Sequence, residues 1–185
     1  MNNRAESIMV MYQLFQTGEG GSLPTSALQM RVERIDWQTA KDCNRAWHSR
    51  LPRIGDPKGT EKAMLFYGAI HGGRCYAVAI WSHPVNRHLP QVEWLELRRM
   101  AICKDAPKNT GSWMLGVMAR MIRKHKPEVV NLISYQDESA HAGTIYRAAG
   151  WIPTVRTNYK PWTNNSRSRP QDQSNGAKQR WEKKI

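Results

Sequence analysis

The feature of this sequence that most constrains its fold is a strand pattern followed at once by a short loop and a strong amphipathic helix. Residues 92–102 alternate in character, so Arg98 and Arg99 are expected to point to opposite faces of a sheet. Ser112 is expected to cap the helix that follows, whose large apolar side chains fall on one stripe. The helix closes with consecutive cations before Pro127, where positive charge opposes the negative end of the helix dipole. Such a stripe requires a sheet for the helix to cover.

Elements on both sides of this unit predict an α/β fold. A weak strand over 32–35 precedes an amphipathic helix over 36–47, and two apolar runs within 63–81 surround a Gly-Gly turn, as in a hairpin. A compact apolar strand at 128–134 and a short helix at 140–149 follow. This order predicts a central mixed sheet, mostly antiparallel, with helices on both faces.

Composition divides the 185 residues into three parts. Residues 1–28 are expected to be a loosely ordered lead-in, and residues 29–157 the folded domain that carries the chemistry. Residues 158–185 are polar and basic and are expected to form a tail, in which 178–185 could return as a final strand.

The net charge of +13 favours a polyanionic partner, with a generally basic, soluble surface as the alternative. The sequence has no apolar stretch of about eighteen residues and no signal-peptide pattern, so we expect a cytoplasmic protein without a membrane span. The three cysteines lack zinc-ligand spacing and fit buried thiols in a reducing compartment.

The loop between the strand and the long helix predicts an anion site. Free backbone N–H groups and the positive end of the helix dipole meet at a helix N-terminus, where they favour a phosphate. Lys104 adds charge, and Gly111 would let a ligand approach closely. The binding set expected on this loop is Lys108, Asn109, Thr110, Gly111 and Ser112.

A second strand and helix strengthen this prediction and carry a resemblance. Residues 134–137 read Ser-Tyr-Gln-Asp, and residues 143–151 read Gly-Thr-Ile-Tyr-Arg-Ala-Ala-Gly-Trp. The pair of units resembles the cofactor-binding half of the GNAT acyltransferases, in which coenzyme A places its pyrophosphate on the loop before the long helix. The loop here, Ala-Pro-Lys-Asn-Thr-Gly-Ser at 106–112, departs from the usual (Arg/Gln)-x-x-Gly-x-(Gly/Ala) pattern of that superfamily.

A narrower resemblance covers 47–157. The motif Leu-Glu-Leu-Arg-Arg at 95–99, the loop at 106–112 and the two motifs of the second unit follow one another as in the bacteriophage Mom family of DNA adenine modifiers. That resemblance implies a GNAT-like fold, acetyl-CoA as cofactor and carbamoylmethylation of adenine N6, which protects phage DNA from restriction in an infected bacterium. The donor of the carbamoylmethyl nitrogen, participation of iron or another metal, and the oligomeric state stay open.

The candidate catalytic residues also have ordinary structural roles as alternatives. The resemblance makes Tyr146 a proton donor to a departing thiolate, where the alternative is an aromatic side chain packed on the sheet. Asp137 could orient or deprotonate an amine, or cap the next helix. Ser134 and Tyr135 are candidates for contacts with pantetheine or substrate. His48 is a candidate for a substrate or metal role, with a structural histidine as the alternative.

Cofactor or DNA contacts are expected from one of Arg98 and Arg99, the other being a solvated or paired charge. An adenine inside a duplex is out of reach, so double-stranded DNA requires base flipping. Trp47, Trp81 and Trp162 are the candidates to stack on the flipped base.

Two other functions stay open on the sequence. One is an ordinary GNAT N-acetyltransferase that acts on a protein or small-molecule amine. The other is a nucleic-acid-binding module that keeps the fold without catalysis.

Overall fold

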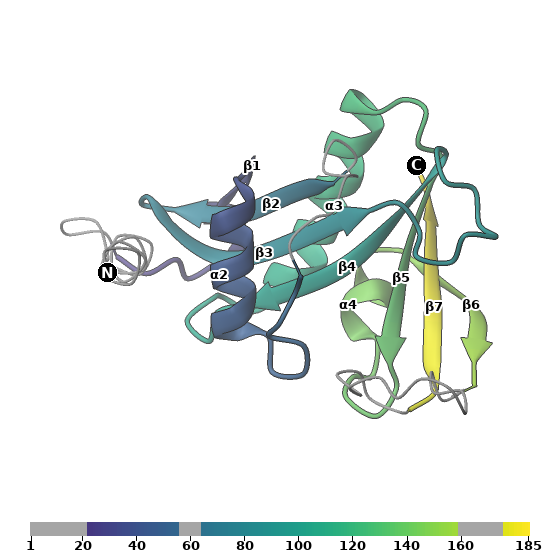
Figure 1. Cartoon of the computed structure of the whole chain (residues 1–185). Coiled ribbons are helices and arrows are strands. Elements are labelled where there is room, and N and C mark those ends of the chain that lie inside the picture. Colours follow the sequence, from purple (N-terminus) through teal and green to yellow (C-terminus); the bar gives the residue numbers. More distant parts are fainter. Residues whose placement is uncertain (1–21, 56–63, 159–175) are drawn as a thin grey trace, which may run out of the picture.

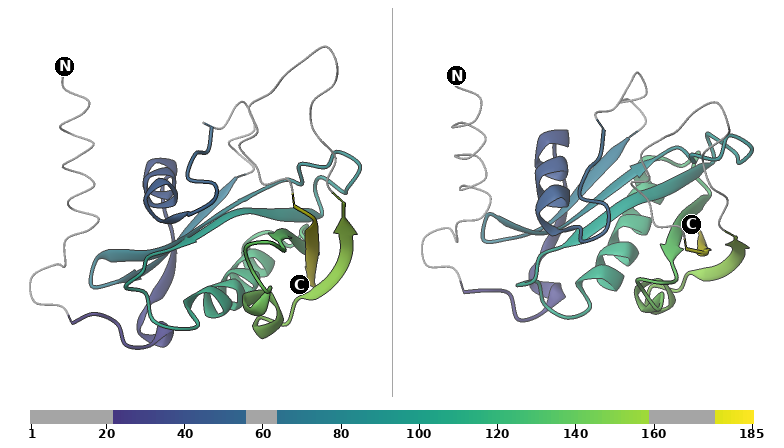
Figure 2. Two further views of the ribbon diagram at one scale, coloured as in Figure 1. Left: turned by 90° about the horizontal axis from the view of Figure 1, so that it is seen from below. Right: turned by 60° about the horizontal axis from the view of Figure 1, so that its bottom comes forward.

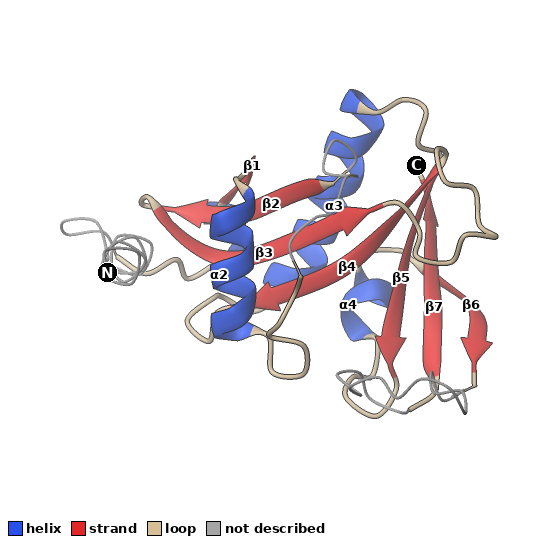
Figure 3. Ribbon diagram, in the orientation of Figure 1, coloured by secondary structure: helices blue, strands red, loops and turns tan. Residues whose placement is uncertain are grey.

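The computed structural model describes residues 22–55, 64–158 and 176–185. In this part of the chain a single sheet of seven strands carries the fold, in the order β1-β2-β3-β4-β5-β7-β6 (Figures 1 and 3). Along the chain the elements are η1 (Ala27–Gln29), β1 (Arg31–Arg34), α2 (Trp37–Trp47), β2 (Leu65–His71), β3 (Arg74–Ser82), β4 (Trp94–Ile102), α3 (Thr110–His125), β5 (Asn131–Asp137), α4 (Thr144–Ala148), β6 (Ile152–Thr157) and β7 (Lys178–Lys184).

The sheet is mixed, and its one parallel pairing joins β4 to β5. All other neighbouring strands are antiparallel. Helix α2 covers one face, while α3 and α4 cover the other (Figure 2). The α/β fold predicted from the sequence, a mostly antiparallel sheet with helices on both faces, is confirmed.

The long helix packs as its apolar stripe requires. Met114, Leu115, Met118 and Ile122 of α3 are fully buried against the sheet. The expected cap at Ser112 is wrong: the helix begins at Thr110, and its N-cap is Asn109 in the left-handed conformation, with φ 67°. The Thr110 hydroxyl donates to the Pro107 carbonyl at 2.7 Å, and this tight turn places the N-cap three residues earlier than expected.

Strands β4 and β5 separate along their length. They pair from Trp94↔Asn131 to Leu97↔Ser134, and both continue beyond that point without further pairing to each other. Two strands that part in the middle of a sheet leave an opening that side chains and a ligand can fill. Figure 1 shows β4 and β5 diverging in this way.

A bulge lies where the two strands begin to part. On the β3 side, Leu97 pairs with Trp81 and Arg99 with Ile80, so Arg98 is an extra residue in β4. The bulge reverses the alternation that the sequence predicted. Leu97 therefore belongs to the core under α3, while Ala101, two residues beyond Arg99, packs with Cys43 of α2.

The last strand lies inside the sheet. Strand β7 pairs with β5 on one side and with β6 on the other, and Trp181 at its centre is buried. The expected final strand therefore exists, but residues 178–184 are part of the core and not of a tail. By pairing with β5, this strand covers an edge that β5 would otherwise leave open.

The described residues include all three cysteines and the helices that could be compared with a membrane span. The thiols of Cys43, Cys75 and Cys103 are free and buried. No helix in residues 22–55, 64–158 or 176–185 is long and apolar enough to cross a membrane.

Candidate active site

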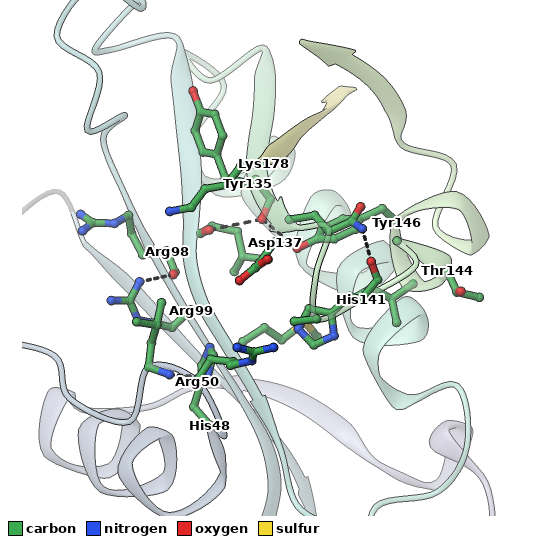
Figure 4. Close-up of a pocket in the computed structure, with 18 of the residues that line it drawn as sticks. His48, Arg50, Arg98, Arg99, Tyr135, Asp137, His141, Thr144, Tyr146 and Lys178 are labelled. Atoms are coloured by element: carbon green, nitrogen blue, oxygen red, sulfur yellow. Dashed lines mark hydrogen bonds between the residues drawn. The ribbon is translucent and has the colours of Figure 1, made fainter. Parts of the chain in front are cut away.

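The divergence of β4 and β5 opens a cavity of about 720 Å³. It is lined by the segment after α2, the second half of β4, the end of β5, residues 140–146 and the first residue of β7. Figure 4 shows these side chains converging from both faces of the sheet. A cavity of this size matches a small-molecule or cofactor site.

Positive charge dominates the lining. Arg50, Arg98, Arg99 and Lys178 supply four cationic side chains, whereas Asp137 is the one carboxylate in the lining. Charge of one sign within a concave surface concentrates the field and attracts ligands of the opposite sign. The cavity is therefore suited to an anionic ligand.

A buried tyrosine lies where β4 and β5 part. The Tyr146 hydroxyl is 2.9 Å from Ser134 Oγ, and Ser134 Oγ donates to the Leu97 carbonyl at 3.4 Å. The ring stacks on Trp181 at 5.4 Å between centroids and meets Trp151 edge-on. Burial raises the pKa of Tyr146, and the hydrogen bond with Ser134 offsets only part of that effect. The phenol is therefore protonated at neutral pH, fixed in place, and able to act as an acid.

Asp137 has a turn-forming role at the end of β5. Its Oδ1 accepts from the Ser139 N–H at 3.0 Å and from the Ser139 hydroxyl at 2.6 Å. Its charge also faces Lys178, which is its pairing partner on β7. Asp137 therefore closes a turn and does not cap the next helix, as the sequence allowed, because the N-cap of α4 is Gly143; its carboxylate also lies in the cavity lining.

Both arginines of the bulge line the cavity, contrary to the expectation that only one would reach a ligand. Arg98 Nε is 3.6 Å from Glu96 Oε1, and its Nη1 is 3.5 Å from Ser82 Oγ. Arg99 donates from Nη1 to the Arg98 carbonyl at 2.7 Å. Within the described part of the chain, no carboxylate lies within ion-pair distance of Arg99, which distinguishes it from its neighbour.

His48 is fixed as a neutral imidazole at the C-terminal end of α2. Its Nδ1 accepts from the Leu51 N–H at 3.1 Å, so in the neutral ring the proton resides on Nε2. Burial, then the charges of Arg99 and His141, lower the pKa of His48 to about 4. His48 lines the cavity as a hydrogen-bond donor. A base or metal ligand would need the lone pairs that this arrangement occupies.

The pKa of His48 predicts a pH dependence of stability. Between its ordinary pKa of 6.5 and the folded value of about 4, the unfolded chain binds a proton that the folded chain does not. The free energy of unfolding should therefore fall as the pH decreases through this window, by about 1–2 kcal/mol once the partial exposure of the ring is allowed for. Urea denaturation at pH 7 and pH 5 measures the fall, which should be smaller in His48→Gln. An identical pH dependence in the two proteins would contradict the assignment.

The helix-opening loop does not line the cavity, although the sequence predicted a cofactor set there. Lys108 and Asn109 are exposed, Ser112 is partly buried, and Thr110 is buried. A Cβ on Gly111 would lie 3.2 Å from both Ile102 and Ile145, which do line the cavity. The glycine thus serves close packing of the helix start against the cavity wall. The N-terminus of α3 adjoins the cavity across these two isoleucines.

Of the tryptophans expected to stack on a base, neither Trp47 nor Trp81 lines the cavity. Trp81 is wholly buried, and its Nε1 donates to Met118 Sδ at 3.3 Å, so it cannot meet a ligand. Trp47 is half-buried against the cluster of Cys43 and Val78, and Trp162 is outside the described residues.

Several lining residues escaped sequence reasoning. Tyr135 was expected and does line the cavity, but so do Arg50, His141 and Lys178, which no motif singled out. Lys178 arrives through the pairing of β7 with β5, a contact distant in sequence. No group of three or more His, Cys, Asp or Glu side chains that could hold a metal ion occurs among the residues described, so the iron left open by the sequence has no fitting ligand set there.

This chain is similar to known proteins in sequence and in fold. The model of the Mom protein family matches residues 29–184. No curated protein matches the sequence.

Solved structures share the fold at low identity. A Bacillus subtilis acetyltransferase in complex with CoA is 12% identical, with a TM-score of 0.57 over 84% of this chain and 99% of that one. The ribosomal-protein-S5-alanine acetyltransferase of Vibrio fischeri is 6% identical, with a TM-score of 0.58 over 84% and 93%. A GNAT-family acetyltransferase of Streptococcus pneumoniae is 10% identical, with a TM-score of 0.54 over 84% and 99%. These similarities establish the GNAT fold expected from the sequence.

Proposed function

The chain belongs to the Mom protein family, and we propose that it is a GNAT-fold transferase that converts adenine N6 in DNA to the carbamoylmethyl derivative with an acyl-CoA cofactor. In this proposal the modification protects phage DNA from host restriction in the cytoplasm of an infected bacterium. The family match supports the choice of DNA as acceptor, and the fold supports the choice of cofactor.

The cation-lined cavity between β4 and β5 is the observation that carries this proposal. It combines an opening of about 720 Å³ with a buried phenol at its inner end and four Lys or Arg side chains around it. Coenzyme A and DNA are both polyanions, and either benefits from such a lining. Acyl-CoA, when bound, would supply an activated thioester whose sulfur leaves as the thiolate of coenzyme A.

Tyr146 is the residue placed to assist that departure. Its raised pKa keeps the phenol protonated at neutral pH, so it can give its proton to an anionic leaving group. Ser134 orients the hydroxyl from 2.9 Å, because its own proton goes to the Leu97 carbonyl and its oxygen is left to accept from the phenol. The proton that the phenol gives to the thiolate is balanced by the proton that the attacking amine releases. The stacked Trp181 ring excludes water from the other face of the phenol.

The acceptor amine is a weak nucleophile, because the lone pair of adenine N6 is delocalised into the ring. Attack of the amine on a thioester carbonyl alone would form an N-acyl bond as the thiolate leaves; the carbamoylmethyl product also needs a bond from N6 to a methylene carbon and an amide nitrogen from a second, nitrogen-containing donor. Rate acceleration must then come mainly from holding the amine against the activated group. Asp137 and Lys178 lie on paired strands at the cavity lining and can orient the base by accepting from and donating to its edge. A duplex adenine reaches them only after flipping, which the cations would support through the phosphate backbone.

The fold also admits an ordinary N-acetyltransferase of a protein or small-molecule amine, since one structure with this fold is a ribosomal-protein-S5-alanine acetyltransferase. The two functions differ in acceptor and product. A peptide or polyamine would receive an acetyl group, and DNA would be inert.

The test is expression of the full chain in a bacterial host, followed by mass spectrometry of nucleosides from its plasmid DNA. The proposal expects deoxyadenosine that carries the mass of a carbamoylmethyl group, absent in cells that express Tyr146→Phe. Unmodified deoxyadenosine together with soluble, folded protein would contradict the proposal. Acetylated peptides or polyamines in the same extracts would select the alternative.

A further inference from the structure

Three hydrogen-bond donors of the cavity gather on the face of the sheet that α2 covers. His48 presents Nε2–H because its Nδ1 is occupied by Leu51. Arg99 lies close enough to shift the pKa of His48, and Arg50 lines the same wall (Figure 4). In residues 22–55, 64–158 and 176–185, neither arginine lies within 4.0 Å of a carboxylate. The wall thus holds donors and charge without a counter-ion from the described chain.

Arg99 is the best-defined member of the group. Its side chain is largely buried, and its Nε is a buried donor without a partner. Burial, then the neighbouring charge of Arg98, lower its pKa to about 10, so the guanidinium remains charged at neutral pH. A buried cation with an unpaired donor lowers the stability of the folded protein unless an anion pairs with it. Arg98, one residue away, already has Glu96 and Ser82.

The backbone that carries His48 and Arg50 is held in place by a buried amide. Asn44 of α2 is fully buried, and its Nδ2 donates to the carbonyls of Leu51 and Pro52 at 3.1 and 3.2 Å. The Leu51 N–H is used by His48. These bonds fix the segment before any ligand arrives, as a pre-organised binding site requires.

The position of this wall indicates that it contacts the acceptor and not the cofactor. The N-terminus of α3, the element suited to a cofactor pyrophosphate, adjoins the cavity from the opposite face of the sheet, behind Ile102 and Ile145. An acceptor that meets the cofactor in the middle must then enter from the α2 face. A nucleotide that enters there brings a phosphate to the mouth of the cavity.

We propose that His48, Arg50 and Arg99 form a seat for one phosphate group of the acceptor nucleic acid, on the α2 face of the cavity. This inference rests on the proposed function, because it takes the acceptor to be nucleic acid. The planar guanidinium of Arg99 donates to two phosphate oxygens, and His48 Nε2–H adds a neutral donor. The seat fixes the position of the target nucleotide and does not read its base.

The test compares the binding of a short, fluorescently labelled adenine-containing oligonucleotide with that of coenzyme A. Arg99→Met should weaken oligonucleotide binding on the order of tenfold in anisotropy titrations. Calorimetry should show coenzyme A binding within about twofold of the wild type, since the seat lies on the acceptor side. Arg123→Met is the matched control: it removes the same charge from the exposed last turn of α3, outside the cavity lining.

A neutral methylphosphonate, placed at each linkage around the adenine in turn, locates the phosphate. At one linkage the wild type should lose affinity while Arg99→Met loses none, because the partner is already absent. Equal losses in both proteins at every linkage would overturn the seat. So would an Arg99→Met effect no larger than that of Arg123→Met, or one confined to coenzyme A.

Two further measurements keep the result interpretable. Arg99→Lys keeps the charge but loses the planar donors, so its affinity for the oligonucleotide should lie between the affinities of the wild type and Arg99→Met. It replaces Arg99→Met in the titrations if that variant is too unstable to measure. If the wild type binds the oligonucleotide in an Arg99-dependent way and does not bind coenzyme A, the phosphate seat is supported and the transferase proposal is refuted. Coenzyme A binding without oligonucleotide binding would refute the seat.

Discussion

Tyr146→Phe is expected to lower the rate of DNA modification on the order of 10²–10⁴-fold, the range lost with a general acid. The substitution removes only the hydroxyl that contacts Ser134 at 2.9 Å, and the stacking on Trp181 remains. The fold should therefore survive, at a cost of about 1 kcal/mol for the lost hydrogen bond. Mass spectrometry of plasmid nucleosides at timed intervals after induction, in cells that express equal amounts of each protein, measures the rate, because the cell supplies the donor of the carbamoyl nitrogen.

Tyr76→Phe is the matched control for this prediction. Tyr76 lies on β3 of the same sheet and is buried, but it does not line the cavity. It should retain the wild-type rate. A Tyr146→Phe variant that also retains it, with unchanged coenzyme A affinity, would remove the phenol from the chemistry.

Gly143→Ala is expected to destabilise the fold by about 2–5 kcal/mol, from a left-handed alanine together with overpacking. Gly143 has φ +72°, and a Cβ there would lie 2.5 Å from both Gln136 Oε1 and Trp181 Cζ2. Gln136 Oε1 accepts from Trp181 Nε1 at 2.6 Å, and its Nε2 donates to the His141 carbonyl. The added methyl group would break this junction between β5, β7 and the start of α4. Urea denaturation measures the loss.

Gly116→Ala provides the contrast within the same protein. Gly116 lies inside α3, where an added Cβ meets only Arg120 Nη1 at 3.8 Å. Alanine should stabilise the helix by about 0.5–1 kcal/mol. Equal effects of the two substitutions would mean that neither the positive φ nor the contact with Trp181 matters.

Local patterns in the sequence were enough to predict the central unit of the fold. The strand at 92–102 and the apolar stripe of α3 lie where they were predicted, and the strand predicted at 128–134 exists but runs over Asn131–Asp137, three residues later. The N-cap of α2 is Asp36, which accepts from the Thr39 N–H at 2.8 Å and stands at the start of the helix predicted over 36–47. Capping and periodicity depend on residues a few positions apart.

The faces of β4 beyond Leu97 could not be predicted. Strict alternation puts Leu97 and Arg99 on one side, but the single extra residue Arg98 reverses the order. A bulge depends on how the neighbouring strand pairs, and no local pattern in β4 records that pairing. The consequence is functional, because it brings both arginines to the cavity.

The rest of the cavity depends on contacts between distant segments. Lys178 reaches it because β7 inserts between β5 and β6, although its surrounding composition indicated a tail. Arg50 and His48 reach it because α2 packs over β3 and β4 on that face. The basic, polar composition around 178–184 allowed a late strand but gave no sign that it lies inside the sheet, with its one large apolar residue, Trp181, buried. Register and packing decide such cases, not propensity.

Soaking crystals of the full chain with coenzyme A is the most direct test that the opening between β4 and β5 holds a thioester beside Tyr146. The account predicts the pantetheine arm within the cavity, its sulfur within hydrogen-bond reach of the Tyr146 hydroxyl, and its pyrophosphate near the start of α3. A coenzyme A molecule bound elsewhere on the surface, or a cavity that stays filled by its own side chains at saturating ligand, would contradict it.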